Sequence, residues 1–337
     1  MAELRWKKGM GPLDFSCFHD TLVEDLDGNV QPMDEPYFKA TEIAPDTWQI
    51  LSQGDFQYVI AGDDEAIVID SGNGCGNLRE FVKTLVPGKK VYRLFNTHNH
   101  GDHTVNNYQF DVTYMSEKCY EGRAKLFEGW EEIEAQIPTD YPVVFLHDGD
   151  VINLKGRPIE VYNIEEHCMG SLQFLDRKNR IFFVGDELND HFFDSRISVE
   201  HSYRNLKRWA SMRDAYDIMC AGNGIADAVY VDRYLQAAEY ILSGHENEGE
   251  EWYVPYEDHI ASAREKDGKK LITRRGPNME DLCYPVTAAG YGKAVELNHG
   301  RGCFCLTRKL SPDAPFDRQL EKFGCKFCYY VNRIWDK

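Results

Sequence analysis

One stretch, Phe95-Asn-Thr-His98-Asn-His100-Gly-Asp102-His103, places three histidines and an aspartate within six residues. It follows residues 91–95, an apolar run typical of a buried strand. Imidazole and carboxylate are ligands that zinc, iron and manganese share, and a turn at a strand end lets closely spaced side chains converge. Eleven histidines placed at random in 337 residues would seldom give this spacing, so we interpret the stretch as part of a metal site.

Two further stretches place metal-binding residue types at the ends of strands. His167 follows the apolar residues 159–164 and precedes Gly170-Ser171, while the apolar run 181–184 is closed by Gly185-Asp186. Both positions repeat the pattern of a polar ligand directly after a buried strand. His167 and Asp186 are therefore further candidate ligands.

Together these motifs resemble those of the metallo-β-lactamase superfamily, and the turn at residues 148–156 is similar to the one that precedes the third histidine in that family. The resemblance covers about residues 40–244. It implies an α+β fold, a four-layer αββα sandwich with the metal site at one end of the two sheets. We therefore expect an N-terminal extension (1–38), a metallo-β-lactamase-like domain (39–244) and a cysteine-rich C-terminal extension (245–337).

The resemblance also implies two divalent cations, with zinc preferred and manganese or iron as alternatives. It assigns the side-chain ligands residue by residue: His98, His100 and His167 to the first metal, Asp102 and His103 to the second, and Asp186 as a bridge. A metal-bound water would then be the nucleophile, because a bound cation lowers the pKa of water. The resemblance further implies a catalytic role for Asp102, which could orient that water or pass its proton to the leaving group.

One position departs from the family pattern. Where the family usually has a histidine in a Pro-Gly-His-Gly turn, this chain reads Gly222-Asn223-Gly224. Asparagine is a neutral oxygen donor and binds transition metals more weakly than imidazole. Asn223 could ligate the second metal, that metal could keep only Asp102, His103, Asp186 and solvent, or the site could be mononuclear. We favour a weakened but occupied second site, since Asp102 and His103 would otherwise be buried polar groups without an evident partner.

Three functions are compatible with these residues. The first is a metal-dependent hydrolase of a small-molecule ester, thioester, lactone or amide. The second is an oxidoreductase like the persulfide dioxygenases of the same superfamily, which hold one iron through residues matching His98, His167 and Asp186. The third is a non-catalytic metal-binding module, which only Asn223 suggests. We favour the hydrolase, and metal analysis distinguishes the three.

Composition narrows the expected partners and location. The chain has 38 Lys and Arg against 56 Asp and Glu, a formal net charge of −18, which disfavours nucleic acid as a partner. It has no run of about 18 apolar residues that could cross a membrane, and residues 1–9 lack the apolar stretch of a secretory signal. We expect a cytoplasmic protein with a small-molecule substrate and no membrane partner, and a homo-oligomer stays open.

The ten cysteines are expected to be thiols, because nothing in the sequence indicates export. Five of them stand among apolar or small residues and are predicted to be small buried hydrophobic groups: Cys75, Cys119, Cys168, Cys220 and Cys283. The pairs Cys303-x-Cys305 and Cys325-x-x-Cys328 could supply four thiolates to a structural zinc. The alternative is a C-terminal hairpin with buried thiols.

Periodicity predicts the secondary structure that carries these motifs. The predicted strands are 48–51, 57–60, 66–69, 91–95, 143–146, 159–164, 172–175, 181–184 and 218–221, of which the first three form an antiparallel meander. The predicted helices are 77–86, 205–216 with a cap at Ser202, and 227–243.

Overall fold

The computed structural model describes most of the chain between residues 38 and 245 and parts of both ends. The described residues are 21–24, 30–32, 38–52, 56–72, 77–123, 137–189, 193–245, 248, 250–253, 264–266, 269–273, 303–306 and 325–330. The chain forms two compact units: Met1–Tyr162 with Ala261–Val286, and Asn163–Ile260 with Thr287–Lys337. Each unit contains part of the expected central domain, and the expected domain boundaries stay a prediction.

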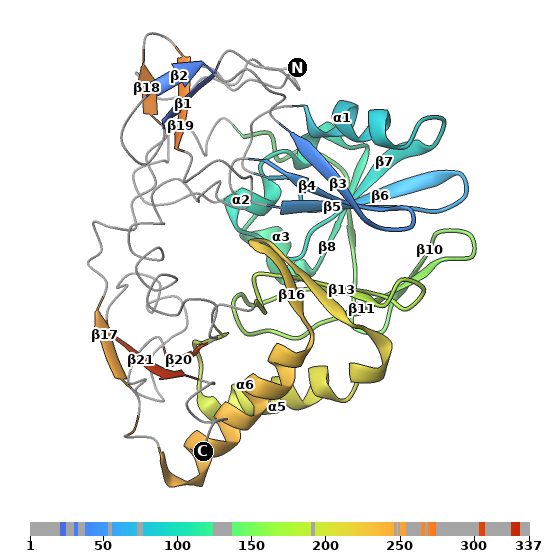
Figure 1. The fold of residues 1–337 in the computed structure, drawn as a ribbon. Coiled ribbons are helices and arrows are strands. Elements are labelled where there is room, and N and C mark those ends of the chain that lie inside the picture. Colours follow the sequence, from blue (N-terminus) through green and yellow to red (C-terminus); the bar gives the residue numbers. More distant parts are fainter. Residues whose placement is uncertain are drawn as a thin grey trace. The chain divides into compact units, whose positions relative to one another are not determined.

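The first unit is built on a seven-stranded sheet (Figure 1). Its strands, in spatial order, are β3 (Lys39–Ala44), β4 (Thr47–Leu51), β5 (Phe56–Ala61), β6 (Glu65–Ile69), β7 (Lys90–Phe95), β8 (Val112–Met115) and β9 (Val143–Phe145). Strands β3 to β6 pair antiparallel, as the predicted meander requires, whereas β6 to β9 pair parallel. The parallel half brings the ends of β6 and β7 to one edge of the sheet.

Short helices connect the parallel strands of this unit: α1 (Leu78–Leu85), α2 (Gly101–Thr104), η1 (Asn107–Gln109) and α3 (Glu117–Glu121). Helix α1 begins after Asn77, whose side chain accepts a hydrogen bond from the backbone N–H of Glu80 at 3.1 Å. Its buried Leu78 and Val82 pack against the sheet together with other buried apolar side chains. The predicted helix at 77–86 is therefore present, with its end at the Pro87-Gly88 turn.

A hairpin of β10 (Val151–Asn153) and β11 (Pro158–Tyr162) is joined to the antiparallel strands by a buried arginine. Arg157 is 1% exposed, and its Nη1 donates to the carbonyl oxygens of Asp46 at 2.8 Å and Ala61 at 3.0 Å. The Arg157 Nη2 also donates to the hydroxyl of Thr47. Because these donors are satisfied by the β3–β4 and β5–β6 regions, the arginine fixes the hairpin within the first unit.

The second unit contains the strands that carry the later motifs. In spatial order they are β12 (Gln173–Asp176), β13 (Ile181–Gly185), β15 (Ile218–Ala221) and β16 (Gly224–Asp227). The β12–β13 and β15–β16 pairs are antiparallel and the β13–β15 pair is parallel. All residues of β13 are buried, as its continuous apolar sequence predicts.

The helices of the second unit lie side by side and share an aromatic core (Figure 1). They are α5 (Val199–Ala210), η2 (Arg213–Ala215), α6 (Val229–Tyr240) and the distorted turn η3 (Ile241–His245). Phe193 packs with its ring centroid 6.3 Å from that of Trp209 of α5 and 5.4 Å from that of Tyr234 of α6. These three buried rings join the two helices to the strand that bears Phe193.

The first of these helices begins earlier than the sequence predicts. Ser198, and not Ser202, caps α5, because its hydroxyl accepts the backbone N–H of His201 at 3.2 Å. Ser202 lies inside the helix and is fully buried, where its hydroxyl donates to Glu166. The predicted cap was wrong because both serines satisfy the capping pattern and only the tertiary contact distinguishes them.

Strands from the chain ends complete each unit. In the second unit a sheet has the order β14 (Phe193–Ser195), β20 (Cys303–Leu306), β21 (Cys325–Tyr330) and β17 (Glu250–Tyr253). In the first unit a sheet has the order β18 (Arg264–Lys266), β19 (Lys269–Thr273), β1 (Thr21–Glu24) and β2 (Val30–Pro32).

The cysteine predictions are confirmed where the structure describes them. Cys119, Cys168 and Cys220 are buried thiols, whereas Cys75 and Cys283 lie outside the described residues. Strands β20 and β21 pair antiparallel with Cys305 opposite Cys328, while Cys325 is opposite Tyr253 of β17. The thiols of these two strands lie outside the described side chains, so the choice between zinc and buried thiols stays open.

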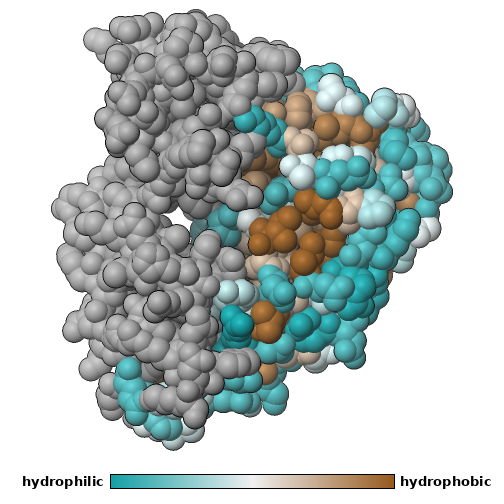
Figure 2. All heavy atoms as spheres, in the orientation of Figure 1, coloured by the Kyte–Doolittle hydropathy of each residue, from teal (hydrophilic) through white to brown (hydrophobic). Residues whose placement is uncertain are grey.

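Hydrophilic and hydrophobic side chains share the described face of the molecule that Figure 2 shows. Figure 2 shows one face on which hydrophilic side chains surround smaller hydrophobic groups. Val144 and Phe145 of β9 and Val151 of β10 are among the large hydrophobic side chains that remain exposed. None of the described helices is long and apolar enough to span a membrane.

Candidate metal centre

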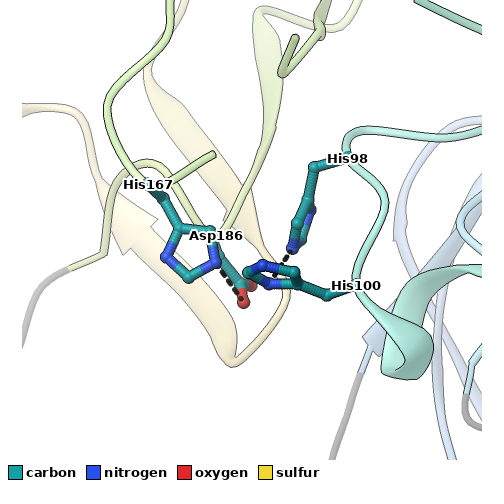
Figure 3. A group of neighbouring side chains, drawn as sticks. All are labelled: His98, His100, His167 and Asp186. Carbon is teal, nitrogen blue, oxygen red and sulfur yellow. Dashed lines mark hydrogen bonds and ion pairs between the residues drawn. The ribbon is translucent and has the colours of Figure 1, made fainter. Parts of the chain in front are cut away.

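His98 and His100 follow strand β7 in the turn that leads to α2. His98 is 1% exposed, and its Nε2 lies 3.0 Å from Nδ1 of His100 (Figure 3). Two ring nitrogens at this distance point to a common place at the strand end. The predicted convergence of the His-x-His pair is therefore present within the first unit.

A buried carboxylate supports this turn from the end of the neighbouring strand β6. Asp70 is 2% exposed and accepts hydrogen bonds from the backbone N–H of Thr97 at 2.8 Å and from its hydroxyl at 2.7 Å. The same carboxylate lies 2.8 Å from Nδ1 of His103. The Thr97 hydroxyl in turn lies 3.0 Å from Nδ1 of His98. Protein groups thus contact Nδ1 of both histidines, which leaves Nε2 as the atom suited to bind a metal.

The two predicted ligands of the second metal lie on helix α2. Asp102 stands in the first turn with its side chain 33% exposed, and its Oδ2 is 3.6 Å from Nε2 of His103, which is 1% exposed. The carbonyl of His103 accepts hydrogen bonds from Asn96 at 2.9 Å and Ser71 at 3.1 Å. This main-chain support fixes the buried histidine, while the carboxylate of Asp102 reaches solvent.

The second unit contains the predicted ligands His167 and Asp186. His167 lies in the loop that precedes β12, and Asp186 directly follows β13. Their side chains are 16% and 25% exposed, and Nε2 of His167 is 3.7 Å from Oδ2 of Asp186. Figure 3 labels both residues, and a dashed line joins the ring of His167 to the carboxylate of Asp186.

Two buried glutamates stand next to these donors in the sequence. Burial raises the pKa of Glu166 to about 8, against the opposing effect of hydrogen bonds from Ser202 and Asn205. Burial also raises the pKa of Glu187 to about 7, against hydrogen bonds from Ser171 and from backbone N–H groups. Sequence reasoning missed both glutamates, since neither stands in a spacing that indicates a ligand.

The chemistry of the donor set fits a divalent cation. Each of the six predicted side chains offers a ring nitrogen or a carboxylate oxygen: His98, His100, Asp102, His103, His167 and Asp186. Mixed imidazole and carboxylate donors suit zinc, manganese and iron. Asn223 lies in the turn between β15 and β16, and its role as a ligand stays a prediction.

Residues 56–219 match the family model of the metallo-β-lactamase superfamily, and this range includes all six side chains. The predicted resemblance to that superfamily is confirmed over these residues. The predicted α+β fold class of that superfamily, a sandwich of mixed sheets and helices, is thereby confirmed. The two histidine motifs and the Gly-Asp at the end of β13 were sufficient to predict this superfamily from the sequence.

Curated relatives within the superfamily are distant. The chain is 27% identical over 161 residues to the acyl-coenzyme A thioesterase MBLAC2 of Homo sapiens, a match that covers 40% of this chain and 58% of the relative. It is 29% identical over 111 residues to a hydroxyacylglutathione hydrolase of Synechocystis sp., covering 33% of this chain and 38% of the relative. The match therefore spans little more than half the length of the human relative.

Solved structures of the superfamily also resemble the chain. A metallo-β-lactamase family protein of Thermus thermophilus matches with a TM-score of 0.46 and 17% identity, covering 61% of this chain and 81% of that protein. A metallo-β-lactamase from Pontibacter korlensis matches with a TM-score of 0.46 and 17% identity, covering 60% of this chain and 99% of that protein.

Proposed function

We propose that the donors of the two units together bind divalent metal and that the protein hydrolyses a thioester. His98, His100 and His167 would hold the first cation, Asp102 and His103 would hold the second, and Asp186 would be a ligand at both. The observation that carries the proposal is that His98 and His100 converge in one unit and His167 and Asp186 in the other. The buried support of Asp70 adds to it, since metal-binding histidines are generally oriented by such carboxylates.

Bound by these residues, a divalent cation lowers the pKa of water and polarises a carbonyl group. Within this arrangement Asp102 is the proposed proton carrier, because its carboxylate is 33% exposed and held beside His103. It accepts the proton of the attacking water and donates it to the leaving group. His103 is held through the contact of its Nδ1 with Asp70, which suits its ring to the role of a ligand.

A thioester is the proposed substrate class because of what the relatives are called. One is an acyl-coenzyme A thioesterase and the other a hydroxyacylglutathione hydrolase, so both names describe hydrolysis of an acyl group from a thiol carrier. This favours hydrolysis over the dioxygenase alternative, in which iron would be bound by His98, His167 and Asp186 alone. Asn223 weakens the second metal in our proposal without removing it.

Thiol release from a set of acyl thioesters tests this function. We would follow free thiol from acyl-coenzyme A and acyl-glutathione with a thiol reagent, and measure metal content by mass spectrometry. We expect metal-dependent release that is lost in His98→Ala and retained in His147→Ala, because the side chain of His147 is 75% exposed and contacts only Asp150 among the described ion pairs. One iron per chain with no thiol release would instead support the dioxygenase.

A further inference from the structure

The main chain around His167 is held by a single buried carboxylate. One oxygen of Glu187, Oε2, accepts the backbone N–H groups of Glu166 at 2.8 Å and His167 at 2.6 Å. Its other oxygen, Oε1, accepts the backbone N–H of Cys168 at 3.3 Å. Three successive N–H groups therefore converge on one side chain, which is itself 4% exposed.

The other side of the same residue is held by an arginine. Nη1 of Arg196 donates to the carbonyl oxygen of His167 at 2.8 Å. Nε of Arg196 lies 3.3 Å from a carboxylate oxygen of Asp194, and both side chains of this ion pair are buried. The N–H and the C=O of His167 thus both bond to buried side chains. Because both polar groups of its backbone are held, His167 has little freedom to rotate.

Glu187 is not one of the proposed metal ligands. It directly follows Asp186, which contacts the ring of His167 at 3.7 Å. Two adjacent side chains at the end of β13 therefore contact His167 in different ways. Asp186 contacts the ring of the histidine, and Glu187 contacts its main chain. A substitution of Glu187 would leave every proposed ligand in the sequence and change only how one of them is held.

We propose that Glu187 is a positioning residue that holds the backbone of His167 in the conformation required for metal binding. This inference rests on the proposed function, because it takes His167 to be a ligand. Outer partners of metal ligands typically change metal affinity by about 10- to 100-fold when they are substituted. Glu187→Gln keeps the size of the side chain but replaces one acceptor oxygen by an NH₂ group, which cannot accept these N–H donors.

A matched control exists at the other end of the same strand pair. Asp176, the last residue of β12, is fully buried, and its Oδ1 accepts the backbone N–H groups of Lys178 at 3.0 Å and Asn179 at 3.4 Å in the turn to β13. Asp176→Asn makes the same chemical change to a buried carboxylate that supports main chain, but none of the proposed ligands lies in its turn. The two variants separate a loss of stability from a loss of metal binding.

The experiment titrates metal-free wild type, Glu187→Gln and Asp176→Asn with Co²⁺, followed by the visible absorption of the bound ion, and compares their urea unfolding. We expect Glu187→Gln to weaken the Co²⁺ affinity by about 10- to 100-fold, and Asp176→Asn to bind Co²⁺ as wild type does even where it lowers stability. Wild-type affinity in Glu187→Gln, or equal weakening in both variants, would overturn the inference. A wild-type protein that binds no Co²⁺ would refute the proposed function and this inference with it.

Hydrogen exchange provides a second readout, and its first part uses the wild type alone. In the metal-free wild type, the amides of Glu166, His167 and Cys168 should exchange slowly, because all three are bonded to Glu187. Glu187→Asp, which keeps the charge but shortens the side chain, should speed exchange at these three amides. Fast exchange of the three amides in the wild type would contradict the inference.

Discussion

Asp70→Asn is the substitution for which the structure gives the most definite expectation. The carboxylate lies 2.7 to 2.8 Å from three donors: the N–H and hydroxyl of Thr97 and the Nδ1 of His103. Asparagine has the same shape and tolerates the φ of 61° at this position, so the change adds no backbone strain. The amide oxygen of the asparagine can still accept the backbone N–H of Thr97. The Thr97 hydroxyl can rotate and accept a hydrogen bond from the amide NH₂. The donor on His103 then loses its acceptor.

The expected cost follows from that single lost contact. A hydrogen bond to a charged group in a buried position is worth about 1.5–3 kcal/mol, so the free energy of unfolding should fall by about 2 kcal/mol. The amide NH₂ also favours a proton on Nε2 of His103 instead of Nδ1, which occupies the atom proposed to bind metal. Affinity for the second cation should therefore fall by about 10- to 100-fold.

Urea unfolding of the metal-free protein and a zinc titration measure the two effects separately. Asp111→Asn serves as the control, because its carboxylate is 60% exposed and pairs with Arg79 on the surface. Exposed pairs of this kind are worth about 0.2–1 kcal/mol, so the control should change stability little and metal binding not at all. An Asp70→Asn variant that matches Asp111→Asn in both measurements would refute the reasoning.

Three further predictions concern other parts of the chain. Gly62→Ala should lower the free energy of unfolding by about 1–3 kcal/mol, because a Cβ there would lie 2.2 Å from the backbone carbonyl oxygen of Leu154, and urea unfolding checks it. In the metal-free protein, burial that raises the pKa of Glu166 from 4.5 to about 8 makes the folded state bind more protons than the unfolded state. The stability of the wild type should thus fall relative to Glu166→Gln between pH 4.5 and 8, by at least about 1 kcal/mol, whereas parallel pH profiles from urea unfolding would contradict that assignment. Asn223→His should tighten the weaker of two zinc affinities and leave the stronger one unchanged, and a zinc titration that shows one affinity in both proteins would point to a mononuclear site.

Much of the fold could be predicted because its signals are local. Strands β5, β6, β7 and β13 are short apolar runs bounded by turns, and helix α1 has both a cap and an apolar stripe. The start of α5 could not be predicted this way. Ser198 and Ser202 both suit a helix cap, and the choice between them depends on Glu166, which is 36 residues away from Ser202 in the chain.

The candidate ligands could be predicted because histidines in such a spacing are chemically distinctive. The groups that support these ligands are not chemically distinctive and could not be predicted. Asp70 directly follows the apolar strand β6, just as Asp186 follows the apolar strand β13. No histidine or other typical metal ligand stands beside Asp70 in the sequence, so its position alone did not indicate a role in the site. Ser71 and Asn96, which hold the carbonyl of His103, carry no signal of their own, because any small polar residue can stand after a strand.

Asp70 and Glu187 support the proposed centre in different ways. Asp70 contacts a ring nitrogen of His103 and, through Thr97, that of His98, so it decides which nitrogen of each ring is available. Glu187 accepts hydrogen bonds from the main chain of Glu166, His167 and Cys168, so it decides where the ring of His167 stands and not its tautomer. Substitution of Asp70 should therefore act on metal binding through the ring nitrogens of His98 and His103, whereas substitution of Glu187 should act on it through the main chain that places His167.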